Sequence, residues 1–72
     1  MSYDYTRLRN KIQAVFGTAG AFAAAIHLSE HSVSKKLNSK TQWKQDEILR
    51  ACVLLDIREQ DIFDYFFTLK IQ

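Results

Sequence analysis

The sequence predicts a compact all-α chain of five short helices, and three observations lead to this fold class. Apolar residues recur every three or four positions, which is the helical period, rather than every second position. The chain has no proline and two glycines, so it carries few residues that break helices. Apolar residues make up 47% of its 72 residues and charged residues 25%, which is typical of a folded domain. We therefore expect one domain over residues 1–72.

The first expected helix ends at Gly17, because glycine adopts the left-handed conformation of a helix end at little cost. Asp4 is its expected N-cap, since a carboxylate accepts the amide hydrogens of a first turn. The apolar face of this helix consists of Leu8, Ile12 and either Val15 or Phe16.

The next two helices are expected on either side of a short turn at residues 27–29. Thr18 is the expected cap of the second helix, and Ser29 that of the third, which runs from residue 29 or 30 to 37. The inner faces consist of Phe22, Ala23 and Ile26 in the second helix and of Val33 and Leu37 in the third. The other residues of the third helix are polar, which favours an exposed helix that contacts another molecule.

A fourth helix is expected from near Lys44, and a fifth over about residues 58–67. Asp46 and Glu47 lie in the first turn of the fourth helix, where the helix dipole favours anions. The expected buried faces consist of Ile48, Leu49, Cys52, Val53 and Leu55 in the fourth helix and mainly of Phe63 and Phe66 in the fifth. The tail, residues 68–72, alternates apolar and polar residues and is expected to be extended or frayed.

Charge is distributed unevenly along the chain. The net charge is +2, but residues 1–44 carry +5 and residues 45–72 carry −3. A cluster of basic residues favours a polyanionic partner such as nucleic acid. The alternative is a solvated surface that happens to be uneven.

Several classes of function are not expected. The single cysteine, Cys52, is expected to be a buried inert thiol, which leaves no disulfide framework and no cysteine zinc site. The string His27-Leu28-Ser29-Glu30-His31 matches that of inverted zinc peptidases, but the expected turn separates its histidines. We expect no enzyme, no metal and no cofactor. The chain has no apolar run of 18 residues and no signal peptide, so we expect a cytoplasmic protein with no membrane partner.

Residues 18–37 carry the pattern of a helix-turn-helix, with His27 at the turn position that glycine usually holds. Further motifs are Tyr3-Asp4-Tyr5, Phe16-Gly17-Thr18, Ser34-Lys35-Lys36-Leu37-Asn38, Trp43, Glu47-Ile48 and Tyr65-Phe66-Phe67. Through these motifs nearly the whole chain resembles the lambda-repressor-like family of phage repressors and Cro proteins. More narrowly, it resembles small Cro-like regulators of temperate phages of Gram-positive bacteria. The resemblance implies a five-helix DNA-binding domain that acts in the bacterial host cell.

The resemblance implies two ways of controlling the choice between lysis and lysogeny. In the first, the chain binds double-stranded operator DNA through its third helix, as Cro proteins do. In the second, the chain is an antirepressor, or modulator of repression, which binds the N-terminal domain of the phage repressor and blocks or alters its operator binding. The acidic second half and Glu30 in the third helix favour the second mechanism.

The outward positions of the third helix are expected to contact DNA bases or a protein partner, and they are Glu30, His31, Ser32 and Lys35. Phosphate contacts are expected from Thr18, Lys36, Asn38, Ser39 and Lys40. The alternatives are a solvated helix and an ordinary polar loop.

A possible protein interface consists of Trp43, Tyr65, Phe67, Leu69 and Ile71, because so many large apolar residues exceed what a small core holds. One candidate partner is a second copy, since a dimer would place two DNA-reading helices about 34 Å apart. The alternatives are that the surface binds a different protein, or that Trp43 packs over the core.

Overall fold

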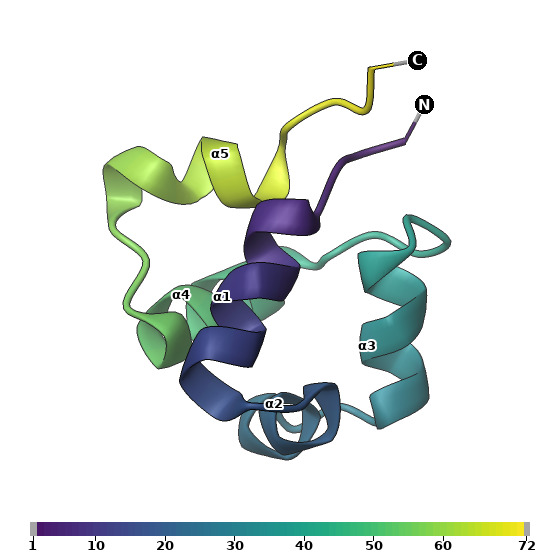
Figure 1. The fold of residues 1–72 in the computed structure, drawn as a ribbon, viewed down its shortest axis with the longest axis vertical. Coiled ribbons are helices and arrows are strands. Elements are labelled where there is room, and N and C mark those ends of the chain that lie inside the picture. Colours follow the sequence, from purple (N-terminus) through teal and green to yellow (C-terminus); the bar gives the residue numbers. More distant parts are fainter. Residues whose placement is uncertain (1, 72) are drawn as a thin grey trace.

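The computed structural model describes residues 2–71, and helices dominate them (Figure 1). The elements are α1 (Thr6–Phe16), α2 (Ala19–Ile26), α3 (Glu30–Leu37), α4 (Gln45–Leu55), the short 3-10 helix η1 (Glu59–Asp61) and α5 (Ile62–Phe66). The predicted all-α class with five helices is confirmed. Met1 and Gln72, which the expected domain and tail include, lie outside the described residues.

The ends of the helices follow the predicted caps. Gly17 ends α1 with a φ of 82°. The hydroxyl of Thr18 accepts the Ala21 amide at 3.1 Å, and that of Ser29 accepts the Ser32 amide at 3.0 Å. His27 takes the left-handed conformation between α2 and α3, with a φ of 63°. This turn therefore forms without glycine, at a small cost in backbone energy.

One expected cap is wrong in position. Tyr5, not Asp4, precedes the first residue of α1, and its side chain caps nothing. Asp4 nevertheless accepts the Thr6 amide at 2.9 Å. Hydrogen bonds from Thr6 lower the pKa of this carboxyl. Tyr5 is instead a buried core residue.

The hydrophobic core lies between all five helices and consists of Tyr5, Leu8, Ile12, Phe22, Ala23, Ile26, Val33, Leu37, Trp43, Ala51, Cys52, Leu55, Ile57 and Phe66. The predicted inner faces of α2 and α3 are all in it, as are Leu8 and Ile12 of α1, and Phe16 packs against it. The small side chain of Ala23 lets α2 lie close to its neighbours, and α2 contacts α1, α3 and α4. The face of α3 opposite Val33 and Leu37 is thereby left outside (Figure 1).

Three expected core residues are exposed: Leu49, Val53 and Phe63. Of the two alternatives on α1, Phe16 packs against the core and Val15 is exposed. On α4, Ala51, Cys52 and Leu55 face the core, so Val53 points outward and is 82% exposed. The fifth helix is also shorter than expected, because residues 59–61 form η1 and α5 begins only at Ile62. In that short helix Phe66 faces the core while Phe63 is 68% exposed.

The two terminal segments lie side by side (Figure 1). Tyr3 and Leu69 form an antiparallel bridge. The Asp4 amide donates to the Thr68 carbonyl at 2.7 Å, and the Lys70 amide donates to the Ser2 carbonyl at 3.0 Å. The tail is therefore extended over residues 68–70. Within residues 2–71, no helix is long and apolar enough to cross a membrane.

Candidate functional site

The outward face of α3 is the first candidate site, and we call its four residues the α3 surface: Glu30, His31, Ser32 and Lys35. Glu30 and His31 are exposed, whereas Ser32 and Lys35 are half-buried. Ser32 accepts a hydrogen bond from the Ser29 hydroxyl at 3.0 Å. The structure thus leaves His31, Ser32 and Lys35 on the outward side of α3, whereas the carboxylate of Glu30 lies beside Gly20 of α2.

Lys36 does not belong to this face, and its predicted role as a phosphate contact is wrong. Its side chain is 9% exposed, and its Nζ lies 3.0 Å from Oε1 of Glu47, which is itself 6% exposed. The ammonium also donates to the Gln42 carbonyl at 3.0 Å. Lys36 therefore ties α3 to the start of α4 in a buried ion pair and offers no charge to a ligand.

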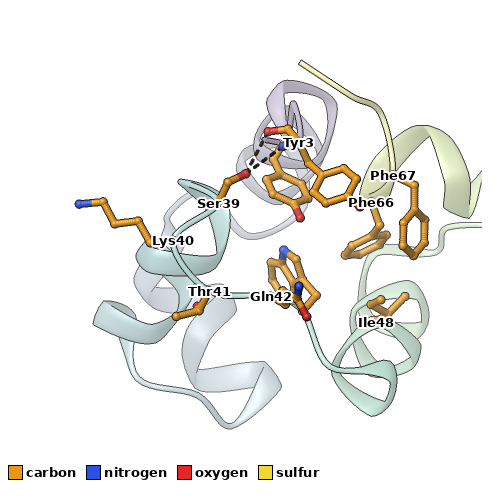
Figure 2. Close-up of a pocket in the computed structure, with 10 residues that line it drawn as sticks. Tyr3, Ser39, Lys40, Thr41, Gln42, Ile48, Phe66 and Phe67 are labelled. Atoms are coloured by element: carbon orange, nitrogen blue, oxygen red, sulfur yellow. Dashed lines mark hydrogen bonds between the residues drawn. The ribbon is translucent and has the colours of Figure 1, made fainter. Parts of the chain in front are cut away.

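The other four residues predicted to contact phosphate differ in how available their side chains are for binding it. Thr18 caps α2, and Asn38 accepts a hydrogen bond from Arg9 at 2.7 Å. Ser39 bonds to both backbone groups of Tyr3, at 3.1 and 3.2 Å. Of the five side chains predicted to hold phosphate, only Lys40 makes no hydrogen bond or ion pair with the described residues, and it extends into solvent (Figure 2).

Sequence reasoning did not identify a structural role for Arg9. Nη2 of Arg9 donates to the Leu37 carbonyl at 3.0 Å as well as to Asn38. Arg9 therefore binds the C-terminal end of α3, where the helix dipole favours a cation. Arg9 and Leu37 are 28 residues apart in the sequence, so no local sequence pattern indicates this contact.

A second candidate surface lies on α5 and the N-terminal segment. The ring of Phe67 meets that of Tyr3 edge-on, with centroids 6.3 Å apart, and lies 6.1 Å from that of Phe63. We call Tyr3, Phe63 and Phe67 the aromatic face. The neighbouring acidic residues on η1 and α5 are Glu59, Asp61 and Asp64. Of these, Asp64 lies 3.5 Å from Nη1 of Arg7, which compensates part of its charge.

The residues predicted as a protein interface divide between the surface and the core. Phe67, Leu69 and Ile71 are exposed. Tyr65 is half-buried, with the guanidinium of Arg7 5.0 Å above its ring. Trp43 is buried and packs edge-on against Phe66, with centroids 5.5 Å apart, so the alternative that it packs over the core is the correct one.

A pocket of about 360 Å³ adjoins the aromatic face, and Tyr3 and Phe67 line both. In Figure 2, residues 39–42 form one wall of this pocket, and Phe66, Phe67 and Ile48 form the opposite wall. Trp43 lines the pocket as well. The Nε1–H of its indole is buried and has no acceptor among the described residues.

Two features of the sequence gain no chemistry from the structure. Cys52 is buried, and burial raises the pKa of its thiol, which keeps it protonated and unreactive. His27 follows α2, whereas His31 lies within α3, so the turn separates the histidines of the zinc-peptidase string. Residues 2–71 contain no cluster of three or more His, Cys, Asp or Glu side chains that could hold a metal ion.

Comparison with known proteins places the chain in a family. The model of a family described as a protein of unknown function (DUF739) matches residues 1–69. The chain belongs to this family. Among solved structures, this DUF739 chain is similar to the modulator of repression (MOR) of the temperate bacteriophage TP901-1 from Lactococcus lactis, determined in solution.

The likeness to that modulator extends over the full chain. The two sequences are 51% identical, the match covers 100% of this DUF739 chain and 97% of the other, and the TM-score is 0.82. No curated protein matches the DUF739 chain significantly. Neither the family description nor the solved structure names a helix-turn-helix or a lambda-repressor-like family, so that resemblance stays a prediction.

Proposed function

We propose that this chain is a modulator of repression, which binds the repressor of its phage and lowers the repressor's occupancy of operator DNA. The observation that carries the proposal is the 51% identity over the whole chain to a protein of that description. The chain acts in this proposal by binding, without catalysis.

The aromatic face is the surface that we assign to the repressor. Aromatic residues are enriched among the residues that contribute most of the binding energy at protein interfaces. A patch of exposed apolar rings also marks a surface that binds another protein. The acidic residues of η1 and α5 complement a partner whose own surface is basic, as a DNA-reading surface must be. Phe67, Leu69 and Ile71, which the sequence predicts as an interface, lie on or next to this face.

The first test is the affinity of the chain for the phage repressor. We expect Phe63→Ala to weaken binding by about 30-fold, or 2 kcal/mol, because Phe63 is the most exposed large ring of the aromatic face. Val53→Ala is the matched control, since Val53 is also exposed but lies on α4. Isothermal titration calorimetry measures both variants and the wild-type chain.

Each outcome of this test is informative. Equal affinities for Phe63→Ala and the wild-type chain would remove the aromatic face from the interface. Absence of any complex at micromolar concentration would refute the modulator function itself. A fluorescence-anisotropy assay of the repressor on operator DNA then shows whether the complex lowers operator occupancy.

A second candidate function is direct binding of operator DNA, the Cro-like mechanism. The observation that favours it is the polar, solvent-accessible side of α3 with His31, Ser32 and Lys35, on a short helix held at both ends. In such a helix Lys35 would donate to guanine, and Lys40 would contact phosphate. The two functions use different surfaces, so one chain can carry both.

Lys35→Ala separates this candidate from the first. If the α3 surface reads bases, the variant loses about 1–3 kcal/mol of discrimination between operator and scrambled DNA. Lys11→Ala is the control, because it removes the same charge from α1 and not from α3. Anisotropy titrations at two salt concentrations provide the ratio of affinities. An unchanged ratio for Lys35→Ala would remove the base-reading role.

A further inference from the structure

The side chain of Glu30 lies against the first turn of α2. A Cβ atom at Gly20 would lie 3.5 Å from both Cδ and Oε1 of Glu30. Gly20 is the second residue of α2, and Thr18 caps the same turn. None of the ion pairs among residues 2–71 includes Glu30, and Glu30 is exposed. An uncompensated negative charge therefore lies at the start of α2.

This position is one at which a helix would otherwise attract phosphate. The free amides and the dipole of a first helical turn favour an anion, and proteins that bind DNA use such turns to hold backbone phosphates. The sequence predicts Thr18 as a phosphate contact for this reason. In the folded chain the carboxylate of Glu30 already supplies the anion. A phosphate that approached Gly20 would therefore meet a like charge.

The other end of α3 carries the opposite charge. Lys35 lies in the last turn of α3, and together with Ser32 and Lys44 it lines an open hollow of about 540 Å³. Neither of these two lysines pairs with an acidic side chain of residues 2–71. A duplex with α3 in its major groove presents a phosphate strand on each side of the helix. The polarised surface of α3 thus suits one of these strands and repels the other.

We propose that Glu30 determines which partner this chain accepts, because its carboxylate at the start of α2 excludes backbone phosphate and prevents tight binding of duplex DNA by α3. The inference does not rest on the proposed function, since it concerns a ligand that is refused and not the way in which the repressor is bound. It opposes the second candidate function, in which α3 reads operator DNA.

Two variants that each lose one negative charge provide the test. Glu30→Gln removes the carboxylate but keeps the size of the side chain. Asp56→Asn is the matched control at the C-cap of α4, where φ is 54° and asparagine is also tolerated. The end of α4 and the helix α3 lie on opposite sides of the molecule (Figure 1). Thermal melting checks that both variants are folded.

Fluorescence anisotropy with labelled operator DNA at low salt measures the affinities. We expect Glu30→Gln to bind about tenfold more tightly than the wild-type chain, because a like charge close to a phosphate is removed. Asp56→Asn is expected to bind less than about twofold more tightly, because screening by salt weakens the effect of a distant charge. The gain of Glu30→Gln is expected to shrink at high salt for the same reason.

Three results would overturn the inference. The first is an equal affinity of Glu30→Gln and the wild-type chain for DNA. The second is an equal gain for Glu30→Gln and Asp56→Asn, which would mean that net charge alone matters. The third is nanomolar binding of operator DNA by the wild-type chain, because Glu30 would then not exclude phosphate. Absence of a complex with the phage repressor would refute the proposed function alone, since the DNA titrations contain no repressor.

Discussion

Replacing Lys36 with methionine is expected to lower the free energy of unfolding by about 3–5 kcal/mol, because the carboxylate of Glu47 is then buried without its counter-ion. The ammonium and the carboxylate lie 3.0 Å apart and are both more than nine-tenths buried. Methionine has nearly the shape of the lysine stem, so the change removes charge more than volume. A domain of 72 residues has a total stability of about 4–11 kcal/mol, and the variant is therefore expected to be close to unfolding.

Urea denaturation followed by the fluorescence of Trp43 measures this effect, since the indole lies in the core. The control is the double variant Lys36→Met with Glu47→Gln, which removes both charges. Its glutamine keeps an oxygen that accepts the Lys44 amide, as Glu47 does at 2.8 Å. We expect the double variant to recover most of the lost stability. A single variant within about 1 kcal/mol of the wild-type chain would show that the pair behaves like an exposed one.

The second large effect is expected from Phe66→Ala, at about 3–5 kcal/mol of lost stability. Phe66 is 2% exposed, and its ring packs edge-on against Trp43. Truncation removes a buried ring and leaves a cavity beneath the helix that carries the aromatic face. We therefore expect repressor binding to fall with stability in this variant.

Phe63→Ala is the matched control, since Phe63 lies on the same short helix but is 68% exposed. We expect its free energy of unfolding to change by no more than about 0.5 kcal/mol, as at most exposed positions. Thermal and urea denaturation of the two variants provide the comparison. Similar losses for both would mean that Phe63 is covered in solution, as the helical spacing alone suggests.

Local chemistry explains which parts of the fold could be predicted from the sequence. Thr18 and Ser29 have side chains that bind free amides of a first turn, and Gly17 tolerates a positive φ, so each marks a helix end without reference to distant residues. The inner faces of α1, α2 and α3 follow in the same way from helical spacing.

The prediction errors arise where contacts with residues distant in the sequence determine which side chains are buried. Five apolar residues on α4 cover more of the helix than the neighbouring helices can bury, and spacing alone cannot say that Leu49 and Val53 remain outside. Because η1 precedes α5, the helical spacing that the sequence predicts over residues 58–67 is interrupted. The five residues of α5 are too few to define a buried face from spacing alone. Lys36 appeared exposed because its partner, Glu47, follows it by eleven residues across a loop.

The candidate site was predictable only in part for the same reason. The outward side of α3 follows from its polar residues, which include His31, Ser32 and Lys35, but spacing alone could not say that Glu30 lies beside Gly20 of α2. The pocket could not be predicted, because the segments that line it come from both ends of the chain and from its middle. Tyr3 meets Phe67 only once the terminal segments pair.

The hydrogen bonds that Arg9 makes to the end of α3 bear on the thermodynamics of association. Because α3 is anchored by Ser29 at its start and by Arg9 at its end, its orientation is fixed before any partner arrives. A preorganised helix loses little conformational entropy on docking, so more of its contact energy is expressed as affinity. The same rigidity restricts the chain to partners whose shape already matches, which makes it a selective binder and not an adaptable one.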